Sequence, residues 1–342
     1  MAWYLYYLFI NNVIWENILL RFYVLMEGGI KGLFSAQILA KFEEVYDTKI
    51  SEQFDLICGT STGGIIALAA SANISMSDVV NFYKEKGPKI FAQKRKKNLG
   101  KLWLKIKQIC YKGKYSNEEL RKALAEVFKD KKIYESSNLL CIPAFDIITA
   151  TPRVFKRDYK KFTEDNKKTY VDVALATSAA PTYLPIHNLE SSQYVDGGVW
   201  ANNPSLVGLM EFLYQFADDE RFNGVDILSI SSLEVAQGNA PKRNYNSFID
   251  WNENLIELFS IGQAKNMTKL FEFLDGKLKF PMNYVRITNE PLSAEHMRNI
   301  SMDNASDRSL KILQSIGNAT AIKAKMDPKV ERFFTTGKTL YF

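Results

Sequence analysis

A serine stands between glycines in the segment Gly59-Thr60-Ser61-Thr62-Gly63. The G-x-S-x-G spacing is typical of a nucleophilic serine on a tight turn between a strand and a helix, because the glycines permit close backbone approach. The N-terminus of the following helix favours the negative charge that develops when a hydroxyl attacks an ester carbonyl. The segment therefore predicts acyl transfer through Ser61, with a glycine turn capped by a serine as the simpler interpretation.

A serine nucleophile needs a base, and the 342-residue chain contains only two histidines. His187 lies in the loop-like segment LPIHN, and we expect it to be structural. His296 follows Ser61 and Asp196 in the chain order of an α/β-hydrolase, so a triad of these three residues stays formally open. Its surroundings, AEHMRN, are typical of the polar face of a short helix, which disfavours this triad.

A carboxylate that acts directly on the serine is the alternative base. Asp196-Gly197-Gly198 follows a short strand-like run. We expect the carboxyl end of that strand to place Asp196 at the sheet edge where Ser61 emerges. An Asp-Gly pair also suits a type I′ or II′ hairpin turn, which is the structural alternative.

A second glycine turn, EGGIKG at residues 27–32, precedes another helical pattern. Its backbone amides are suited to an oxyanion hole, and as an isolated loop it is equally suited to cradle a phosphate. The loop lacks the first glycine of the dinucleotide-binding fingerprint, and the chain has no Walker lysine pattern. The oxyanion interpretation therefore depends on the presence of Ser61.

Short apolar runs rich in strand formers precede these turns. Two consecutive strand-turn-helix units argue for a parallel sheet covered by helices. The sequence predicts six strands, at Leu19–Leu25, Phe54–Cys58, Leu139–Phe145, Tyr194–Asp196, Asp226–Ile230 and Asn283–Ile287. Helical patterns lie at Leu33–Val45 and in the Ala-, Ile- and Leu-rich run that follows GTSTGG and ends at about Ala72. Others lie at Asn117–Phe128, Val171–Ser178, Pro204–Phe216, Asn252–Phe273 and Arg308–Lys325.

The composition is that of a globular chain, with 46% hydrophobic and 24% charged residues. We expect one α/β domain, with an atypical extension over 1–18, a catalytic core over 19–235 and a C-terminal helical part over 236–342. The apolar segment at the N-terminus is interrupted before it reaches the roughly 18 to 20 residues that span a bilayer. It also lacks the features of a secretory signal. Three cysteines without paired or metal-like spacing indicate a reducing, cytoplasmic location and no bound metal.

The net charge of +6 is concentrated in residues 84–114, which hold twelve Lys and Arg against one acid. Apolar residues recur there at helical spacing, which predicts an amphipathic basic element. We interpret it as a peripheral contact with anionic lipid headgroups, with a solvated cap helix as the alternative. No nucleic-acid-binding module accompanies the stretch, so a nucleic acid polymer is not expected as a partner.

Three motifs occur in a fixed order: EGGIKG at 27–32, GTSTGG at 59–64 and DGGVWANNP at 196–204. Together with SAAPTYLP at 178–185, they resemble the patatin-like phospholipases over residues 22–233. The resemblance implies a three-layer patatin-like fold, with a central mostly parallel sheet flanked by helices. It also implies hydrolysis of phospholipid acyl esters through a Ser-Asp dyad and an acyl-enzyme, with no cofactor.

Carried over position by position, the resemblance makes Ser61 the nucleophile, Asp196 the base, and the amides of Gly28 and Gly29 the oxyanion hole. Lys31 stands where the family has Arg or Lys. The other residues that support these motifs are Gly32, Gly59, Gly63, Gly197 and Gly198.

The chain departs from the family pattern at one place, with Met26 and Glu27 where the family has Asp and Gly. A side chain at a position that needs positive φ costs about 1–2 kcal/mol, and a carboxylate repels an oxyanion. We therefore expect either weakened activity or a Glu27 side chain that points away from the site.

Two further segments, FYKEKGPKIF at 82–91 and LLCIPAFDIITATPRVFKRDY at 139–159, are similar to bacterial patatins of cyclic-oligonucleotide (CBASS-type) antiphage systems. This likeness implies a cyclic dinucleotide activator that switches on degradation of the cell's own membrane, and it allows an oligomer. Two other interpretations stay open. One is the His296-dependent hydrolase, and the other is a non-catalytic patatin-fold module that senses a lipid or a nucleotide.

Overall fold

The structure is a computed structural model that describes residues 19–26, 28–92, 114–160, 162–235 and 248–342, with only the backbone described over 248–257. Glu27, the extension over 1–18 and most of the basic stretch at 84–114 therefore lie outside the described residues. None of the described helices is long and apolar enough to cross a bilayer.

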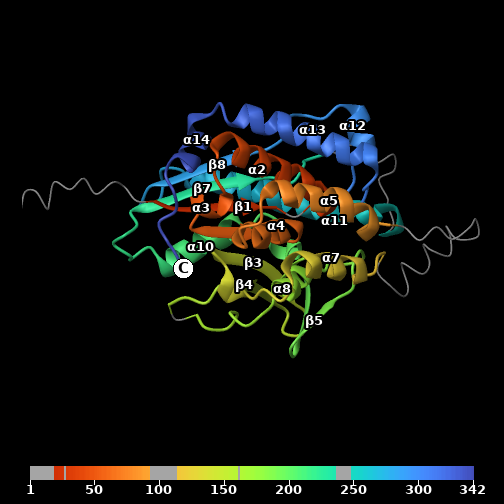
Figure 1. The fold of residues 1–342 in the computed structure, drawn as a ribbon, viewed down its shortest axis with the longest axis horizontal. Coiled ribbons are helices and arrows are strands. Elements are labelled where there is room, and N and C mark those ends of the chain that lie inside the picture. The colour runs from red at the N-terminus through yellow and green to blue at the C-terminus, as the bar shows by residue number, and fades with distance from the viewer. Residues whose placement is uncertain (1–18, 27, 93–113, 161, 236–247) are drawn as a thin grey trace, which may run out of the picture.

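A mixed sheet of eight strands forms the centre of the described chain, in the order β5-β6-β3-β2-β1-β7-β8, with β4 also paired to β3 (Figure 1). The five strands that are adjacent in the order β3-β2-β1-β7-β8 run parallel to one another. β4, β5 and β6 run antiparallel to the strands with which they pair. The strands are β1 (Leu19–Leu25), β2 (Leu56–Gly59), β3 (Leu139–Asp146), β4 (Thr151–Phe155), β5 (His187–Leu189), β6 (Ser192–Asp196), β7 (Gly224–Ile230) and β8 (Met282–Ile287).

Helices cover both faces of this sheet, so the fold has three layers, as predicted (Figure 1). Side chains alternate along β1, with Phe22 and Val24 in one core and Tyr23 and Leu25 in the other. The larger core contains residues from η1 (Gly29–Lys31), α2 (Gly32–Tyr46), α3 (Ile50–Gln53), α4 (Thr62–Ser71), α5 (Met76–Ile90), α7 (Glu118–Phe128), η2 (Ile133–Glu135), α8 (Tyr170–Thr177), α13 (Asp307–Ala324) and α14 (Pro328–Thr335). The smaller one contains residues from α9 (Gly198–Ala201), α10 (Ser205–Gln215) and α11 (Phe248–Leu274).

The six predicted strands are all present, with ends that differ by one or two residues. The sequence analysis did not find β4 and β5. β4 contains Pro152 and is half exposed, and β5 is only three residues long, so neither shows the continuous apolar run of a buried strand. It also missed several helices, among them α5, whose sequence is mostly polar.

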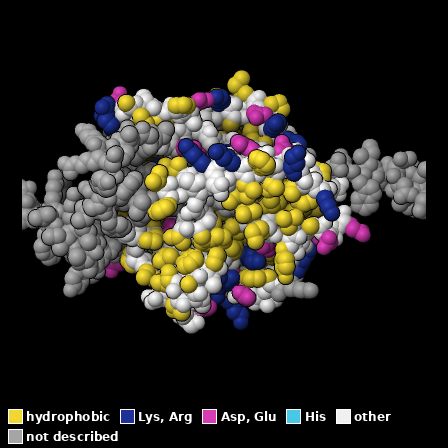
Figure 2. All heavy atoms as spheres, turned by 180° about the vertical axis from the view of Figure 1, so that it is seen from behind, with side chains coloured by type: hydrophobic (Ala, Val, Ile, Leu, Met, Phe, Trp, Pro, Cys, Tyr) yellow, Lys and Arg dark blue, Asp and Glu magenta, His cyan; other side chains and the backbone are white. Residues whose placement is uncertain are grey.

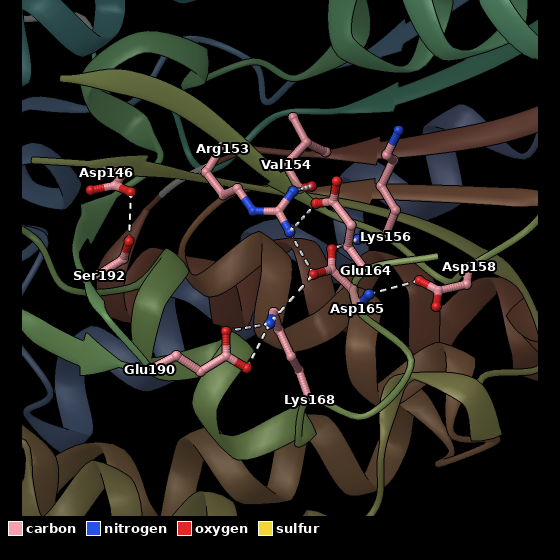
Figure 3. Close-up of polar contacts among 10 residues, drawn as sticks. All are labelled: Asp146, Arg153, Val154, Lys156, Asp158, Glu164, Asp165, Lys168, Glu190 and Ser192. Carbon is pink, nitrogen blue, oxygen red and sulfur yellow. Dashed lines mark hydrogen bonds and ion pairs between the residues drawn. The ribbon is translucent and has the colours of Figure 1, made fainter. Parts of the chain in front are cut away.

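The segment between β4 and α8 is held by a network of charged side chains (Figure 3). The Asp165 carboxylate lies 2.5 Å from Arg153 and 3.8 Å from Lys168, and it accepts a hydrogen bond from the amide of Lys156. Lys168 also pairs with Glu190 at 2.9 Å, which joins the segment to the turn after β5. Burial raises the pKa of Asp165 to about 6, although the neighbouring cations oppose the shift.

The outer face of α10 and α11 carries several large hydrophobic side chains in solvent, including Tyr214 and Phe273, each 82% exposed. The view of the molecule from behind shows a broad hydrophobic area (Figure 2). Gly262 of α11 has no atom within 4 Å of the position that a Cβ would take, so this part of the helix is open.

Candidate active site

Ser61 sits on the turn that joins the end of β2 to the start of α4, as predicted from its motif. Its backbone angles are φ 56° and ψ −123°, a strained conformation for a residue with a side chain. The glycines around it are required by contact, since a Cβ on Gly59 would lie 2.3 Å from the carbonyl oxygen of Gly63. This strained and crowded turn presents the Ser61 side chain at the N-terminus of α4.

Thr177, at the end of α8, joins the Ser61 turn to the turn that follows β6. The amide of Ser61 donates to Thr177 Oγ1 at 3.0 Å, and that hydroxyl donates to the carbonyl of Pro143 at 2.5 Å. The amide of Gly197 donates to the backbone carbonyl of Thr177 at 3.3 Å. Thr177 is a residue that the sequence analysis missed, because one threonine near a helix end has no distinctive pattern.

Asp196 is the last residue of β6 and is 1% exposed. Its Oδ1 accepts a hydrogen bond from the amide of Gly198 at 2.7 Å, which orients the carboxylate. Gly197 has φ −62° and ψ −19°, and a helical turn follows, so the Asp-Gly pair does not form a type I′ or II′ turn.

Asp196 reaches this edge of the sheet by a different route from the one predicted. β6 runs antiparallel to β3, so its carboxyl end does not share an edge with the carboxyl ends of the parallel strands. The two residues meet at one level because Asp196 pairs with Ala144, three residues beyond Cys141 on β3. Cys141 itself pairs with Cys58, and Ser61 is three residues beyond Cys58.

The glycine loop after β1 contributes backbone amides at the same edge of the sheet. The amide of Ile30 donates to the carbonyl of Met302 at 2.8 Å, and the amide of Lys31 donates to the carbonyl of Gly28 at 3.0 Å. Within the described part of the chain, no acceptor is bonded to the amides of Gly28 and Gly29. Gly29 has φ +55°, and a Cβ there would lie 2.2 Å from the Met302 oxygen, so glycine is required.

Residues distant in the sequence support this loop. Met26 is 3% exposed, and its sulfur accepts a contact from Arg286 Nη2 of β8 at 3.0 Å. The same guanidinium donates to Ser229 of β7 at 2.9 Å and pairs with Glu234 at 2.9 Å. Met26 is therefore part of the sheet-edge packing, whereas Glu27 lies outside the described residues.

A narrow apolar cavity, called here the Ser61 cavity, adjoins the nucleophile and the glycine loop. Its volume is about 60 Å³. Its lining includes Ser61, Gly29, Ile65, Phe82, Tyr83, Ile90, Leu120, Tyr183 and Met302. Gly28 and Lys31 line an adjoining cavity instead, so the predicted site residues are divided between two spaces that share Met302.

Tyr83 of α5 spans the start of α2 and the start of α4. Its hydroxyl donates to the carbonyl of Thr62 at 3.4 Å, and a Cβ on Gly32 would lie 2.6 Å from that hydroxyl. Burial raises the pKa of Tyr83, so the side chain stays protonated at neutral pH. Tyr83 thus spaces the glycine loop after β1 from the Ser61 turn, a role that no sequence motif indicated.

The two histidines lie elsewhere. His187 of β5 is 3% exposed, and its Nε2 is 3.4 Å from Asp172, an interaction that helps to hold the pKa of Asp172 below its usual range. His296, in the short helix α12 (Ala294–Asn299), lines two open grooves along α13, and Ser61 lines neither of them. Among the described residues, no cluster of three or more His, Cys, Asp or Glu could hold a metal ion.

A serine on a strained strand-to-helix turn, an aspartate at the end of a strand and a glycine loop at the same sheet edge are the features of a serine acyl hydrolase. A family model described as patatin-like phospholipase matches residues 28–208, and the chain belongs to this family.

The chain is 29% identical over 311 residues to a protein of Pseudomonas aeruginosa named cGAMP-activated phospholipase, covering 90% of this chain and 89% of that protein. A Vibrio cholerae protein of the same name is 29% identical over 316 residues, covering 86% and 88% of the two chains. Human GIVD cytosolic phospholipase A2 matches in structure with a TM-score of 0.44 and 8% identity, covering 93% of this chain and 61% of that one.

Proposed function

We propose that the protein is a lipid acyl hydrolase of the phospholipase A type that acts through Ser61 and Asp196. Asp196 takes the Ser61 proton as the hydroxyl attacks the ester carbonyl, and the amides of Gly28 and Gly29 stabilise the oxyanion. The leaving alcohol takes the proton from Asp196, and an acyl-enzyme remains. Water activated by Asp196 then releases the fatty acid and restores Ser61.

One observation carries this proposal. Ser61 lies in the wall of an apolar cavity that Gly29 also lines, and Thr177 ties the Ser61 turn to the turn that carries Asp196. An apolar cavity suits a fatty acyl chain, and a catalytic serine at its wall places the ester at the polar end of that chain.

We also propose that a cyclic dinucleotide activates the enzyme, as the names of its bacterial relatives say of those proteins. The Ser61 cavity is narrow, and we propose that its walls move apart to admit an acyl chain. A ligand that favours the wider conformation raises activity by shifting this equilibrium. Degradation of the cell's own membrane on such a signal fits an antiphage effector.

The experiment is fatty-acid release from anionic phospholipid vesicles, with and without cGAMP. We expect release by the wild type with cGAMP, loss of release in Ser61→Ala and Asp196→Asn, and release within about twofold of wild type in His296→Ala. Loss of activity in His296→Ala would instead support the histidine-dependent hydrolase. If a serine-directed fluorophosphonate does not label Ser61 either with or without cGAMP, the protein is a non-catalytic binding module.

Peripheral membrane contact through the basic stretch at 84–114 is part of the proposal, and it rests on the cationic residues there other than Lys86 and Lys114, which pair with Glu126 and Asp303. Substitution of Lys94, Arg95, Lys96 and Lys97 by Gln removes four charges, each worth about 1 kcal/mol near an anionic surface. We expect weaker binding to anionic vesicles at low salt and unchanged binding to neutral ones. Vesicle binding that ignores both salt and anionic-lipid content would contradict this contact.

A further inference from the structure

The oxyanion loop is held in place by a segment that lies far downstream in the chain. The carbonyl of Met302 accepts the Ile30 amide at 2.8 Å and contacts Gly29 so closely that a Cβ there would lie 2.2 Å away. Met302 also lines both the Ser61 cavity and the adjoining cavity of Gly28. This one carbonyl therefore holds the peptide between Gly29 and Ile30, directly after the Gly28 and Gly29 amides.

Asp303, the next residue, is fixed by side chains from another part of the molecule. Its Oδ2 lies 2.5 Å from Lys114 Nζ and accepts a hydrogen bond from the Tyr115 hydroxyl at 2.8 Å. The side chains of Asp303 and Lys114 are 11% and 17% exposed, so solvent screens this pair little. Burial raises the pKa of Asp303, but the Lys114 and Tyr115 contacts outweigh it and hold that pKa below its usual range.

Lys114 and Tyr115 are attached in turn to the wall of the Ser61 cavity. The amide of Lys114 donates to the carbonyl of Thr182 at 2.9 Å, and the amide of Tyr115 donates to the carbonyl of Tyr183 at 2.8 Å. Tyr183 lines the cavity together with Met302. Asp303 therefore connects two walls of the cavity and stands one residue from the support of the oxyanion loop.

We propose that Asp303 is a positioning residue for the reaction, which fixes the Met302 carbonyl through its contacts with Lys114 and Tyr115 and so orients the oxyanion loop. The inference rests on the proposed function, because it assigns a role in that reaction. Asp303 touches no reacting atom. Its effect is to keep the amides of Gly28 and Gly29 aimed at the oxyanion, where a displacement of about 1 Å costs about 10²-fold in rate.

The test compares Asp303→Asn and Lys114→Met with wild type on anionic vesicles in the presence of cGAMP. We expect kcat to fall about 10- to 100-fold while KM changes less than about threefold, because acyl-chain binding in the cavity is retained. Lys114→Arg keeps the ion pair, and we expect it to restore most of the activity that Lys114→Met loses. Asp219→Asn is the matched control, since it breaks a pair with Arg221 at 2.8 Å that has no contact with the site.

Hydrogen exchange at the Ile30 amide separates this inference from the proposed function. We expect faster exchange in Asp303→Asn and Lys114→Met and wild-type exchange in Asp219→Asn. If these two site variants keep wild-type kcat while Ser61→Ala is inactive, the positioning role is wrong and the enzyme assignment stands. If the wild type itself releases no fatty acid, the proposed function fails. The positioning role is then overturned as well if the Ile30 amide exchanges at the same rate in wild type, Asp303→Asn and Lys114→Met.

Discussion

Thr177 shows how one residue connects the two turns that carry Ser61 and Gly197. Its hydroxyl accepts from the Ser61 amide and donates to the Pro143 carbonyl, while its own carbonyl accepts from Gly197. All of these groups are buried with it, so each would pay a desolvation cost if its partner were removed. The strained backbone of Ser61 is maintained by contacts of this kind.

Replacement of Thr177 by Val keeps the shape of the side chain but leaves the Ser61 amide and the Pro143 carbonyl without this partner. We expect a loss of about 1–3 kcal/mol in the free energy of unfolding and a lower kcat, because the Ser61 turn loses its anchor. Thr177→Ser retains the hydroxyl and serves as the control. Urea unfolding and fatty-acid release measure the two effects, and a fully active, fully stable Thr177→Val would contradict the anchoring role.

Gly29 offers a second test, with Gly276 as a matched control. Both have positive φ, +55° and +63°, but only Gly29 is crowded by the Met302 carbonyl, whereas Gly276 has open space around it. Alanine at Gly276 should cost about 1 kcal/mol in stability and leave kcat unchanged. Alanine at Gly29 should also displace the loop and remove most activity. Equal effects of the two substitutions on kcat would show that backbone strain alone, and not the contact with Met302, matters.

The sequence predicts the groups that carry chemistry better than the groups that hold them. Ser61, Asp196 and the glycines occur in spaced motifs because their chemistry needs particular side chains, or the absence of one. Met302 supports the oxyanion loop through a backbone carbonyl, which any residue could supply, so its position leaves no trace in the sequence. Thr177 is equally hard to find, because its partners become neighbours only after β3 and α8 pack together.

At the scale of elements, the direction of β6 was the error in the prediction. A run that ends in Asp-Gly-Gly after an apolar residue indicates a strand, but it does not say which way the strand pairs. β6 pairs antiparallel with both β3 and β5, and β5 was too short to be recognised from the sequence. The long parallel strands β1 and β7 were predicted well because nearly all of their residues are buried, so each reads as a continuous apolar run.

The segment between β4 and α8 should make stability depend on pH through Asp165. Its pKa of about 6 in the folded state lies above the usual value of 3.8, so the native state holds this proton more strongly than the unfolded state does. The stabilisation of the folded state by protonated Asp165 is therefore complete below about pH 4, and it is lost as pH rises through 6. Relative to Asp165→Asn, we expect wild type to lose about 3 kcal/mol of unfolding free energy between pH 4 and 7.

Chemical unfolding at several pH values measures this difference. Asp219→Asn is the control, because the Arg221 side chain holds the pKa of Asp219 near 2, so its effect on stability changes only below about pH 4. The unfolding free energies of wild type and Asp219→Asn should change with pH in the same way between pH 4 and 7. A constant gap between wild type and Asp165→Asn over that range would show that Asp165 is ionised throughout.

At the scale of the whole molecule, the proposed activator must favour one conformation of the folded chain. A ligand that binds the native state and not the unfolded state adds RT ln(1 + [L]/Kd), about 2.7 kcal/mol at 100 times Kd. We therefore expect cGAMP to raise the Tm in a concentration-dependent way, with a linear dinucleotide of the same bases as the control. No shift with cGAMP, with or without vesicles, would contradict direct activation by this ligand.

The support of Gly29 by Met302 also has a consequence for synthesis on the ribosome. The two residues are separated by 273 positions, while Ser61 and Asp196 are both translated well before Met302. A nascent chain therefore carries the proposed nucleophile and base for some time before the proposed oxyanion loop has the carbonyl that orients it. For an enzyme whose proposed substrate is the membrane of its own host, this order of synthesis delays full activity until Met302 has been translated and has reached Gly29.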